Sequence, residues 1–319
     1  MKETYFIKLY SQQWKEAEQL LKLKRGSVDP DKIARYYTQI SDDLSYAATF
    51  YPQSSTTHYL NSLASSFHRL IYSRKYEKRS RLITFWTREQ PRLVYRYRYS
   101  MLVALLFFAV SAFLGILSSH YDKMFARIVM GETYMRMTEL NIQNGDPLAV
   151  YKQAHEITMF LGITVNNIRV ALSAFALGTV FSAGTSVLLF FNGVMIGTFH
   201  YFFYENGLLF ESLKTVWIHG TLEISAIIIS AGAGMIIGNS ILFPGTYKRL
   251  VSFQKGASDG IKVLIGVIPL FIVAGFLEGF VTRHTELPDY IRVGIILICF
   301  VFIILYYFVY PIIVNRRQK

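Results

Sequence analysis

Long apolar blocks in the C-terminal two thirds of the chain restrict its fold more than any other feature. Residues 101–119 contain no charged side chain, and residues 157–204 contain a single one, Arg169. A helix needs about 20 consecutive, mostly apolar residues to cross the core of a bilayer. Because hydrophobic residues make up 52% of the 319-residue chain and gather in such blocks, the sequence predicts an all-α integral membrane protein.

The apolar blocks predict six membrane spans. We expect them at residues 101–119, 160–181, 186–205, 215–241, 261–281 and 290–313. Spans two and three share one long block, which we divide near Ser182-Ala183-Gly184, although Asn192-Gly193 is an equally good turn signal. The fourth span ends before Phe243-Pro244-Gly245.

Residues 1–98 predict a helical bundle followed by a basic segment, ahead of a membrane domain at 99–319. Apolar residues recur at helical spacing over 3–24, and Trp14 is expected in the core. Asp29-Pro30 is a typical helix start, which predicts a second helix that runs to about Phe50. A third helix is expected to begin after Ser54-Ser55-Thr56.

The charge distribution predicts the orientation in the membrane. Residues 69–98 hold ten Lys and Arg against two acids, and the 246–262 loop and the 315–319 tail are also basic. The connectors 120–156, 206–214 and 282–289 are balanced or acidic. By the positive-inside rule, both termini are cytoplasmic and the 120–156 connector is extracytoplasmic. The net charge of +12 therefore indicates contact with the lipid bilayer of the cytoplasmic membrane and not with nucleic acid.

Polar residues inside the spans predict a buried cluster. The fourth span contains WIHGTLEISAIIISAGAGMIIG, in which His219 and Glu223 lie one helical turn apart. A carboxylate at that depth costs about 2.5–3.5 kcal/mol without a partner. With the topology above, six polar side chains lie in the outer halves of their spans: Asn166, Asn167, Arg169, His219, Glu223 and Glu278. We expect Arg169 to pair with Glu223, with Glu278 as the competing acid.

The chemistry of this cluster has three interpretations: a structural ion-pair network, a polar pocket or proton path, and a metal site. His219 and Glu223 have a spacing that suits a metal ion, but a catalytic zinc requires three protein ligands, and neither an HExxH motif nor an obvious third ligand is present. No Walker loop, nucleophile elbow or kinase motif occurs. We therefore expect no enzymatic activity, no cofactor and no metal.

Small residues on the fourth span predict a helix-packing ridge. Ala226, Ser230, Gly234 and Gly238 follow one another at four-residue spacing, which allows a second helix to approach closely. The ridge suits an internal packing face and the face of a homodimer equally well. Asn192 and Asn239 are expected to hydrogen-bond across helices, a contact worth about 1 kcal/mol. Cys299 is the single cysteine, so no intramolecular disulfide forms.

Several segments carry a family resemblance. They are the Trp14-containing helix, DLSYAATFYP (43–52), YLNSLASSFHRLIY (59–72), NNIRVALSAFALG (166–178), FNGVMIG (191–197) and HGTLEISAIIISAGAG (219–234). In this order they resemble the stage II sporulation protein M family of bacterial and archaeal membrane proteins. The resemblance implies that the characteristic polar and glycine positions are Asn167, Arg169, Gly193, His219, Gly220 and Glu223.

The resemblance also implies a cellular setting. The founding member of the family belongs to an engulfment complex, where it looks like a membrane anchor for peptidoglycan-degrading partners. Other members often lie near genes for a MoxR-type ATPase, which implies an envelope-associated assembly. We therefore expect a non-enzymatic scaffold that recruits membrane or envelope proteins. The alternative is a transporter, channel or lipid-handling protein that uses the outer-half polar pocket, and an intramembrane hydrolase ranks third. The 120–156 connector suits a partner-binding surface or a lid over the polar cluster.

Overall fold

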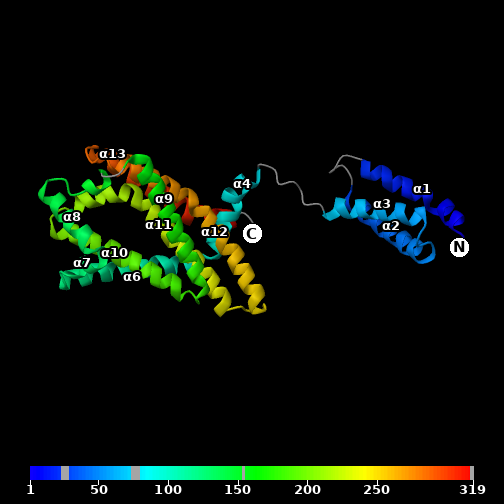
Figure 1. Ribbon diagram of the computed structural model, residues 1–319, viewed down its shortest axis with the longest axis horizontal. Helices are drawn as coiled ribbons and strands as arrows, with labels where there is room; N and C mark the ends of the chain where they lie inside the picture. The colour runs from blue at the N-terminus through cyan, green and yellow to red at the C-terminus, as the bar shows by residue number, and fades with distance from the viewer. Residues whose placement is uncertain (23–28, 73–79, 153–154, 317–319) are drawn as a thin grey trace. The chain divides into compact units, whose positions relative to one another are not determined.

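The computed structural model describes residues 1–22, 29–72, 80–152 and 155–316, and every regular element in these ranges is helical. The chain divides into two compact units, Met1–Arg81 and Leu82–Lys319, whose helices are labelled in Figure 1. The all-α fold predicted from the sequence is confirmed. The predicted division at residue 98 differs from the division by contacts, because residues 82–98 pack with the membrane-spanning unit.

The first unit contains three helices: α1 (Glu3–Lys22), α2 (Pro30–Phe50) and α3 (Ser55–Tyr72). Asp29 caps α2, because its Oδ1 accepts a hydrogen bond from the Asp31 backbone N–H at 3.0 Å. The three helices share one apolar core, whose fully or nearly fully buried members include Phe6, Trp14, Ile40, Leu60 and Phe67. Residues 23 and 24 of the predicted first helix lie outside the described residues.

A short helical segment leads into the membrane-spanning unit. It contains α4 (Ser80–Thr84), the π-helical η1 (Phe85–Glu89) and α5 (Gln90–Arg96). Tyr97, which follows α5, donates a hydrogen bond from its hydroxyl to Asp259 Oδ2 at 2.7 Å. Gln90 is fully buried and donates from Nε2 to the Val263 carbonyl at 3.2 Å. These contacts join the segment, from Leu82 onward, to the second unit.

The described residues contain six helices long and apolar enough to cross a membrane, as predicted. They are α6 (Arg98–Tyr121); α9 (Glu156–Ala176) with η3 (Leu177–Thr179); α10 (Ala183–Glu205); α11 (Leu209–Leu242); α12 (Arg249–Phe276) with η4 (Leu277–Thr282); and α13 (Asp289–Ile303) with η5 (Ile304–Val309) and α14 (Tyr310–Arg316). Spans two and three separate at Phe181 and Ser182, whose φ angles are 51° and 65°. The break thus lies beside the predicted Ser182, while Asn192-Gly193 is inside α10.

The connector between the first two spans is itself partly helical. It contains α7 (Phe125–Met130), α8 (Glu132–Gln143) and the short 3₁₀ turn η2 (Ala149–Lys152). Arg127 links α7 to α8 through ion pairs of 2.7 Å to Glu132 and 2.8 Å to Glu139. The described residues of the connector are therefore a structured part of this unit.

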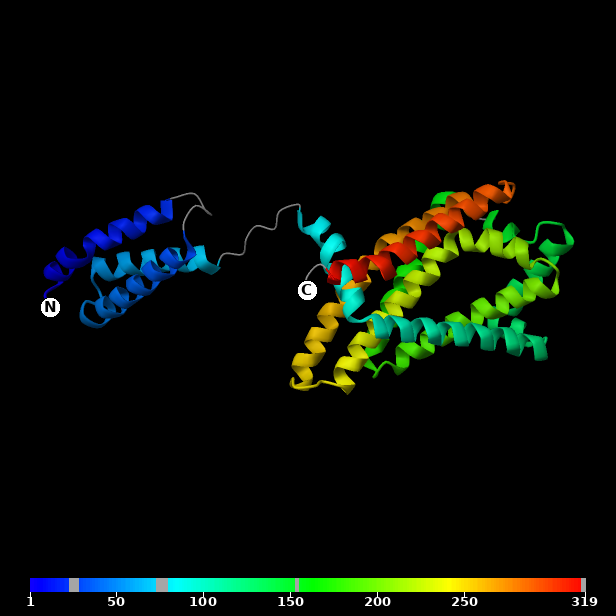
Figure 2. The ribbon, with the colours of Figure 1, turned by 180° about the vertical axis from the view of Figure 1, so that it is seen from behind.

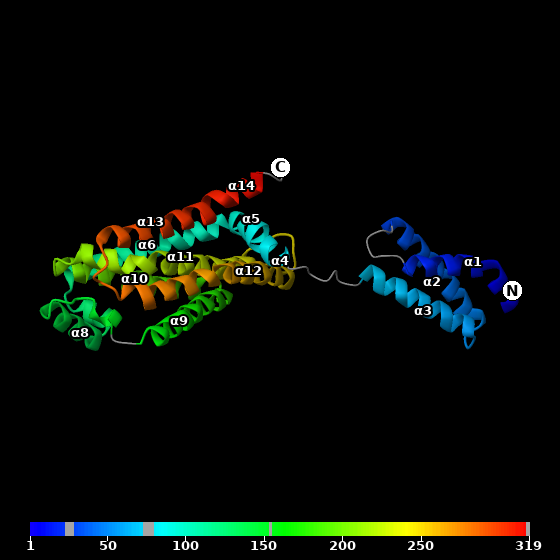
Figure 3. The same ribbon diagram turned by 90° about the horizontal axis from the view of Figure 1, so that it is seen from above.

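Helix α11 is the centre of the membrane-spanning unit. It packs against α6, α9, α10, α12 and α13, and Figure 3 shows it with α6 and α13 on one side and α9 on the other. The end of the last span returns to the start of the first, because Tyr306 and Tyr310 donate to the backbone carbonyls of Trp86 and Thr87 at 2.7 and 2.8 Å. Figure 2 shows α14, in red, beside this cyan segment.

The small residues of α11 form an internal packing face. A Cβ on Gly234 would lie 2.5 Å from the Ala174 carbonyl oxygen of α9, and one on Gly238 would lie 2.0 Å from Ser182 Oγ. Ala226 and Ser230, on the same ridge, are fully buried within this single chain. Of the two interpretations of the ridge, the structure places Gly234 and Gly238 at internal helix contacts.

The predicted bond between Asn192 and Asn239 is wrong. Asn192 donates from Nδ2 to the Leu188 carbonyl of its own helix at 2.9 Å, while Asn239 is exposed. A side chain that bonds to the carbonyl four residues earlier satisfies its donor locally, so it needs no partner on another span.

Candidate functional site

His219, Glu223 and Glu278 form a compact group inside the membrane-spanning unit, which we call the His–Glu–Glu cluster. Each offers one ligand atom, and these three atoms lie within 4.8 Å of one another. His219 Nε2 is 3.7 Å from Glu278 Oε2, and the two side chains are only 5% and 13% exposed. The sequence prediction that these three residues share one polar region of the spans therefore agrees with their placement.

A hydrogen bond orients the imidazole of His219. Its Nδ1 lies 3.0 Å from Oγ1 of Thr282, a side chain that is 1% exposed. In the tautomer that donates Nδ1–H to Thr282, the lone pair of Nε2 faces the carboxylate of Glu278. Such a second hydrogen bond is the usual way in which a protein sets the tautomer of a functional histidine.

The π-helical turn η4 supplies both Glu278 and Thr282. A π-helical turn holds one more residue than an α-helical turn, so it changes the direction of the side chains that follow, and such turns are frequent at functional sites. Close contacts hold η4 against α9: a Cβ on Gly279 would lie 3.1 Å from the Phe160 backbone nitrogen, and one on Gly275, a turn earlier, would lie 2.2 Å from Thr164 Oγ1.

Helix α9 brings Asn167 to the cluster. Asn167 is 4% exposed and lies beside the carboxylate of Glu223. Within the described part of the chain, however, its Nδ2 has no partner in hydrogen-bonding geometry. A buried amide nitrogen without a partner costs about 1–3 kcal/mol, and the Glu223 carboxylate is the acceptor close enough to offset this cost.

The structure does not bring Arg169 or Asn166 to the cluster, since both are exposed. The predicted ion pair between Arg169 and Glu223 is therefore wrong. Successive residues are about 100° apart around an α-helix, so Arg169 points roughly 200° away from Asn167. The face of α9 that packs against α11 and α12 carries the asparagine, and the arginine lies on the opposite side.

The connector covers the cluster from one side through Tyr151 of η2. The Tyr151 ring meets the His219 ring edge to face, with 5.8 Å between the centroids. Burial, and then the nearby carboxylates of Glu278 and Glu223, raise the pKa of Tyr151 well above its ordinary value. The sequence suggested two roles for the connector, a partner-binding surface and a lid. A contact with His219 is what we expect of a lid.

No lysine or arginine within the described ranges forms an ion pair with Glu223 or Glu278. Arg283, one residue beyond η4, pairs instead with Glu156 at 3.3 Å. The cluster therefore combines two carboxylates and one imidazole with no compensating cation from the described chain. Two bare carboxylates at this depth are unfavourable, so the arrangement is suited to taking up protons or a positively charged ion.

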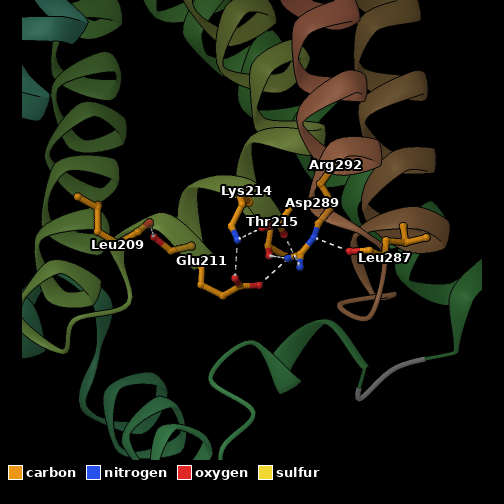
Figure 4. Close-up of polar contacts among 8 residues, drawn as sticks. Leu209, Glu211, Lys214, Thr215, Leu287, Asp289 and Arg292 are labelled. Carbon is orange, nitrogen blue, oxygen red and sulfur yellow. Dashed lines mark hydrogen bonds and ion pairs between the residues drawn. The ribbon is translucent and has the colours of Figure 1, made fainter.

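A second polar group, centred on Arg292, was not anticipated from the sequence (Figure 4). Arg292 is 7% exposed, and its guanidinium contacts Glu211 Oε1 at 2.5 Å and Asp289 Oδ1 at 3.1 Å. Lys214 completes the group with an ion pair of 2.7 Å to Asp289. The signal was available, because a charge inside the predicted 290–313 span requires a partner. The group ties the start of α11 to the start of α13.

Gly193 and Gly220, which the resemblance singled out, differ in their surroundings. A Cβ on Gly193 would lie 2.6 Å from Ser111 Cβ, so this glycine permits the contact between α10 and α6. A Cβ on Gly220 would meet only side-chain atoms at 3.7 Å or more. The position next to His219 therefore has room for the Cβ of an alanine.

Comparison with known proteins gives two family matches. Residues 104–283 match the family described as "Stage II sporulation protein M", and residues 4–73 match a domain of unknown function, DUF8413. An uncharacterized protein of Methanocaldococcus jannaschii, MJ0793, is 30% identical over 128 residues, which cover 39% of this chain and 70% of that protein. No solved structure matches the chain. The first match includes every member of the His–Glu–Glu cluster.

Proposed function

The chain belongs to the stage II sporulation protein M family, and we propose that it is a non-enzymatic membrane scaffold that recruits partners of an envelope-associated complex. The observation that carries this proposal is the two-unit organisation. A helical unit with its own core precedes a membrane-spanning unit, and the two units match separate families. A folded unit attached to membrane spans is suited to holding a partner at the membrane.

The surface of the first unit supports this proposal. Tyr5 and Leu9 lie one turn apart on α1 and are 58% and 50% exposed, and Phe50 at the end of α2 is 57% exposed. Aromatic side chains are enriched at protein–protein interfaces. We propose that this face of α1 contacts the partner.

A second surface lies on the connector. On α8, Leu140 is 53% exposed and the Arg136 side chain is 74% exposed. With the predicted orientation, this surface faces the side of the membrane where peptidoglycan-remodelling partners act. The scaffold would then hold proteins on both sides of the membrane.

Cross-linking in native membranes tests the scaffold. The full chain is compared with a chain lacking residues 3–71 and with the double variant Tyr5→Ser/Leu9→Ser. We expect the same set of cross-linked proteins to be lost from both. The matched control, Lys8→Ser/Gln12→Ser, changes two exposed residues of the same helix and should keep that set. If all four chains capture the same proteins, the scaffold proposal is wrong.

A cavity favours lipid handling as the second candidate. It measures about 280 Å³, and apolar side chains such as Leu102 and Ile229 line it together with Arg98. An apolar cavity beside a guanidinium suits an acyl chain with an anionic headgroup. Under this candidate, Ile229→Trp fills the cavity and prevents cross-linking of a photoreactive anionic phospholipid. Val110→Trp, on an exposed position of α6, does not.

A further inference from the structure

We propose that His219, Glu223 and Glu278 bind one divalent transition-metal ion, such as Zn²⁺, inside the membrane-spanning unit. This inference is independent of the scaffold proposal. It also departs from the sequence expectation of no metal, which rested on the lack of a third ligand beside His219 and Glu223. The structure supplies that ligand, because η4 places Glu278 against His219.

The distances suit a single ion. Zn²⁺ binds imidazole nitrogen and carboxylate oxygen at roughly 2.0–2.2 Å, so two ligands of one ion lie about 3–4 Å apart. His219 Nε2 and Glu278 Oε2 are separated by 3.7 Å, and the ligand atoms of all three residues lie within 4.8 Å of one another. Small rotamer changes bring the set to coordination distance.

One doubly charged ion satisfies the charge balance of the cluster. With both carboxylates ionised and the imidazole neutral, the three side chains carry a charge of minus two, and none of the described lysines or arginines offsets it. One divalent cation makes the whole assembly neutral. A neutral assembly is the form that a membrane interior tolerates, since an unpaired charge at the bilayer centre is strongly unfavourable.

The residues beside the three ligands resemble the hydrogen-bond partners of metal ligands in other proteins. A metal-bound histidine almost always uses its other ring nitrogen in a hydrogen bond, which fixes the tautomer. Thr282 Oγ1 occupies that position at 3.0 Å from His219 Nδ1, so Nε2 is free to bind the ion. The amide nitrogen of Asn167 is buried beside the Glu223 carboxylate, close enough to act on it as a donor but outside the geometry of a well-formed hydrogen bond. It is placed to donate to a carboxylate oxygen or to a metal-bound water when the ion is present.

The ligand types select the kind of ion. Ca²⁺ and Mg²⁺ prefer oxygen ligands alone, whereas imidazole together with carboxylate suits Zn²⁺ and its neighbours among the first-row metals. Three protein ligands leave one position of a tetrahedral ion open. Tyr151 of the connector contacts the His219 ring edge to face, so the connector lies against the ligand set.

Metal titration of the full chain in lipid nanodiscs, prepared without a polyhistidine tag, tests the proposal. After treatment with a chelator, Co²⁺ is added and its visible absorption bands are recorded, and then Zn²⁺ is added in competition. We expect one ion per chain and displacement of Co²⁺ by Zn²⁺. His219→Gln, Glu223→Gln and Glu278→Gln should each weaken binding by more than tenfold. Thr282→Val should weaken it about 10- to 100-fold, as loss of a ligand's hydrogen-bond partner does.

Two control variants keep the result specific. His200→Gln changes another buried histidine, whose Nε2 accepts from Trp217 at 3.1 Å, and Glu205→Gln changes an exposed acid at the end of α10. Both should bind Co²⁺ as the unaltered chain does. The proposal is overturned if the unaltered chain binds no ion, or if the cluster variants and the controls bind equally. If the unaltered chain binds no ion and the double variant Glu223→Gln/Glu278→Gln has a higher unfolding temperature, the two carboxyl groups carry protons in place of an ion. If a cluster variant fails to fold, the unaltered chain and Thr282→Val still decide the question.

Discussion

Asp43 is a buried carboxylate that ties two helices of the first unit together. Trp14 Nε1 of α1 donates a hydrogen bond to Asp43 Oδ2 of α2 at 2.7 Å, and the two residues are 4% and 8% exposed. Burial raises the pKa of Asp43 above its ordinary 3.8, and the hydrogen bond from Trp14 opposes this shift. The carboxyl group therefore holds its proton more tightly in the folded chain than in the unfolded chain.

This shift predicts how the stability of the first unit depends on pH. A carboxyl group with a raised pKa in the folded state stabilises the fold fully below its unfolded pKa, and this contribution is lost as the pH rises through the folded value. Asp43→Asn keeps an oxygen acceptor for Trp14 but carries no charge. We expect this variant to be more stable than the unaltered chain at pH 7, and the difference to shrink below pH 4.

The measurement is the thermal unfolding of the first unit, followed by the fluorescence of Trp14 in a full chain with Trp86→Phe and Trp217→Phe. Asp42→Asn, an exposed neighbour whose charge makes the smallest contribution to the raised pKa of Asp43, serves as the comparison and should change the unfolding temperature at pH 7 less than Asp43→Asn does. A lower unfolding temperature for Asp43→Asn than for the unaltered chain at pH 7 would contradict this account.

Gly178 allows η3 and α11 of the membrane-spanning unit to lie in close contact. It lies in η3, and a Cβ at this position would be 2.1 Å from the Gly234 carbonyl oxygen of α11. The Cβ would be fixed directly to the backbone of η3, and the carbonyl oxygen belongs to the backbone of α11. Rotation of a side chain therefore cannot relieve the contact. Overpacking of a well-packed interior costs about 1–3 kcal/mol, and we expect Gly178→Ala to lose at least that much stability.

Gly162→Ala on α9 is the matched control, because no atom lies within 4 Å of a Cβ at that position. Alanine is the better helix former by about 1 kcal/mol, so this variant should not lose stability. Thermal unfolding of both purified variants in one detergent separates the two cases. Equal midpoints would show that α11 can move away from η3, against the close contact described here.

The bilayer explains why the spans could be predicted and the site only in part. A span needs a continuous apolar stretch, so the six elements were visible in the sequence. The face that a helix turns inward depends on tertiary packing. The sequence placed both Asn167 and Arg169 in the cluster, but only Asn167 is buried. The π-helical turn that aims Glu278 at His219 has no sequence signal of its own. The third ligand of the cluster could therefore be named among the polar residues, but its role could not be recognised.

We expect both ends of the membrane-spanning unit to lie on one side of the membrane. An even number of spans requires this, and the contacts of Tyr306 and Tyr310 with the segment before the first span agree with it. The choice of the cytoplasmic side is a prediction from the charge distribution alone. Lys248 and Arg249 begin the fifth span beside Thr246, whereas Glu286 lies in the loop at the opposite end of that span.

Cysteine labelling in intact cells tests this orientation. Cys299 is buried, and Cys299→Ser gives a background without thiols in which Thr246→Cys and Glu286→Cys each add one exposed site. By the positive-inside rule, a membrane-impermeant maleimide should label Glu286→Cys in intact cells and Thr246→Cys only after permeabilisation. The His–Glu–Glu cluster would then draw its ion or protons from outside the cell membrane. The reverse pattern of labelling would place Tyr151 and the cluster toward the cytoplasm, and the connector could no longer contact peptidoglycan-remodelling partners.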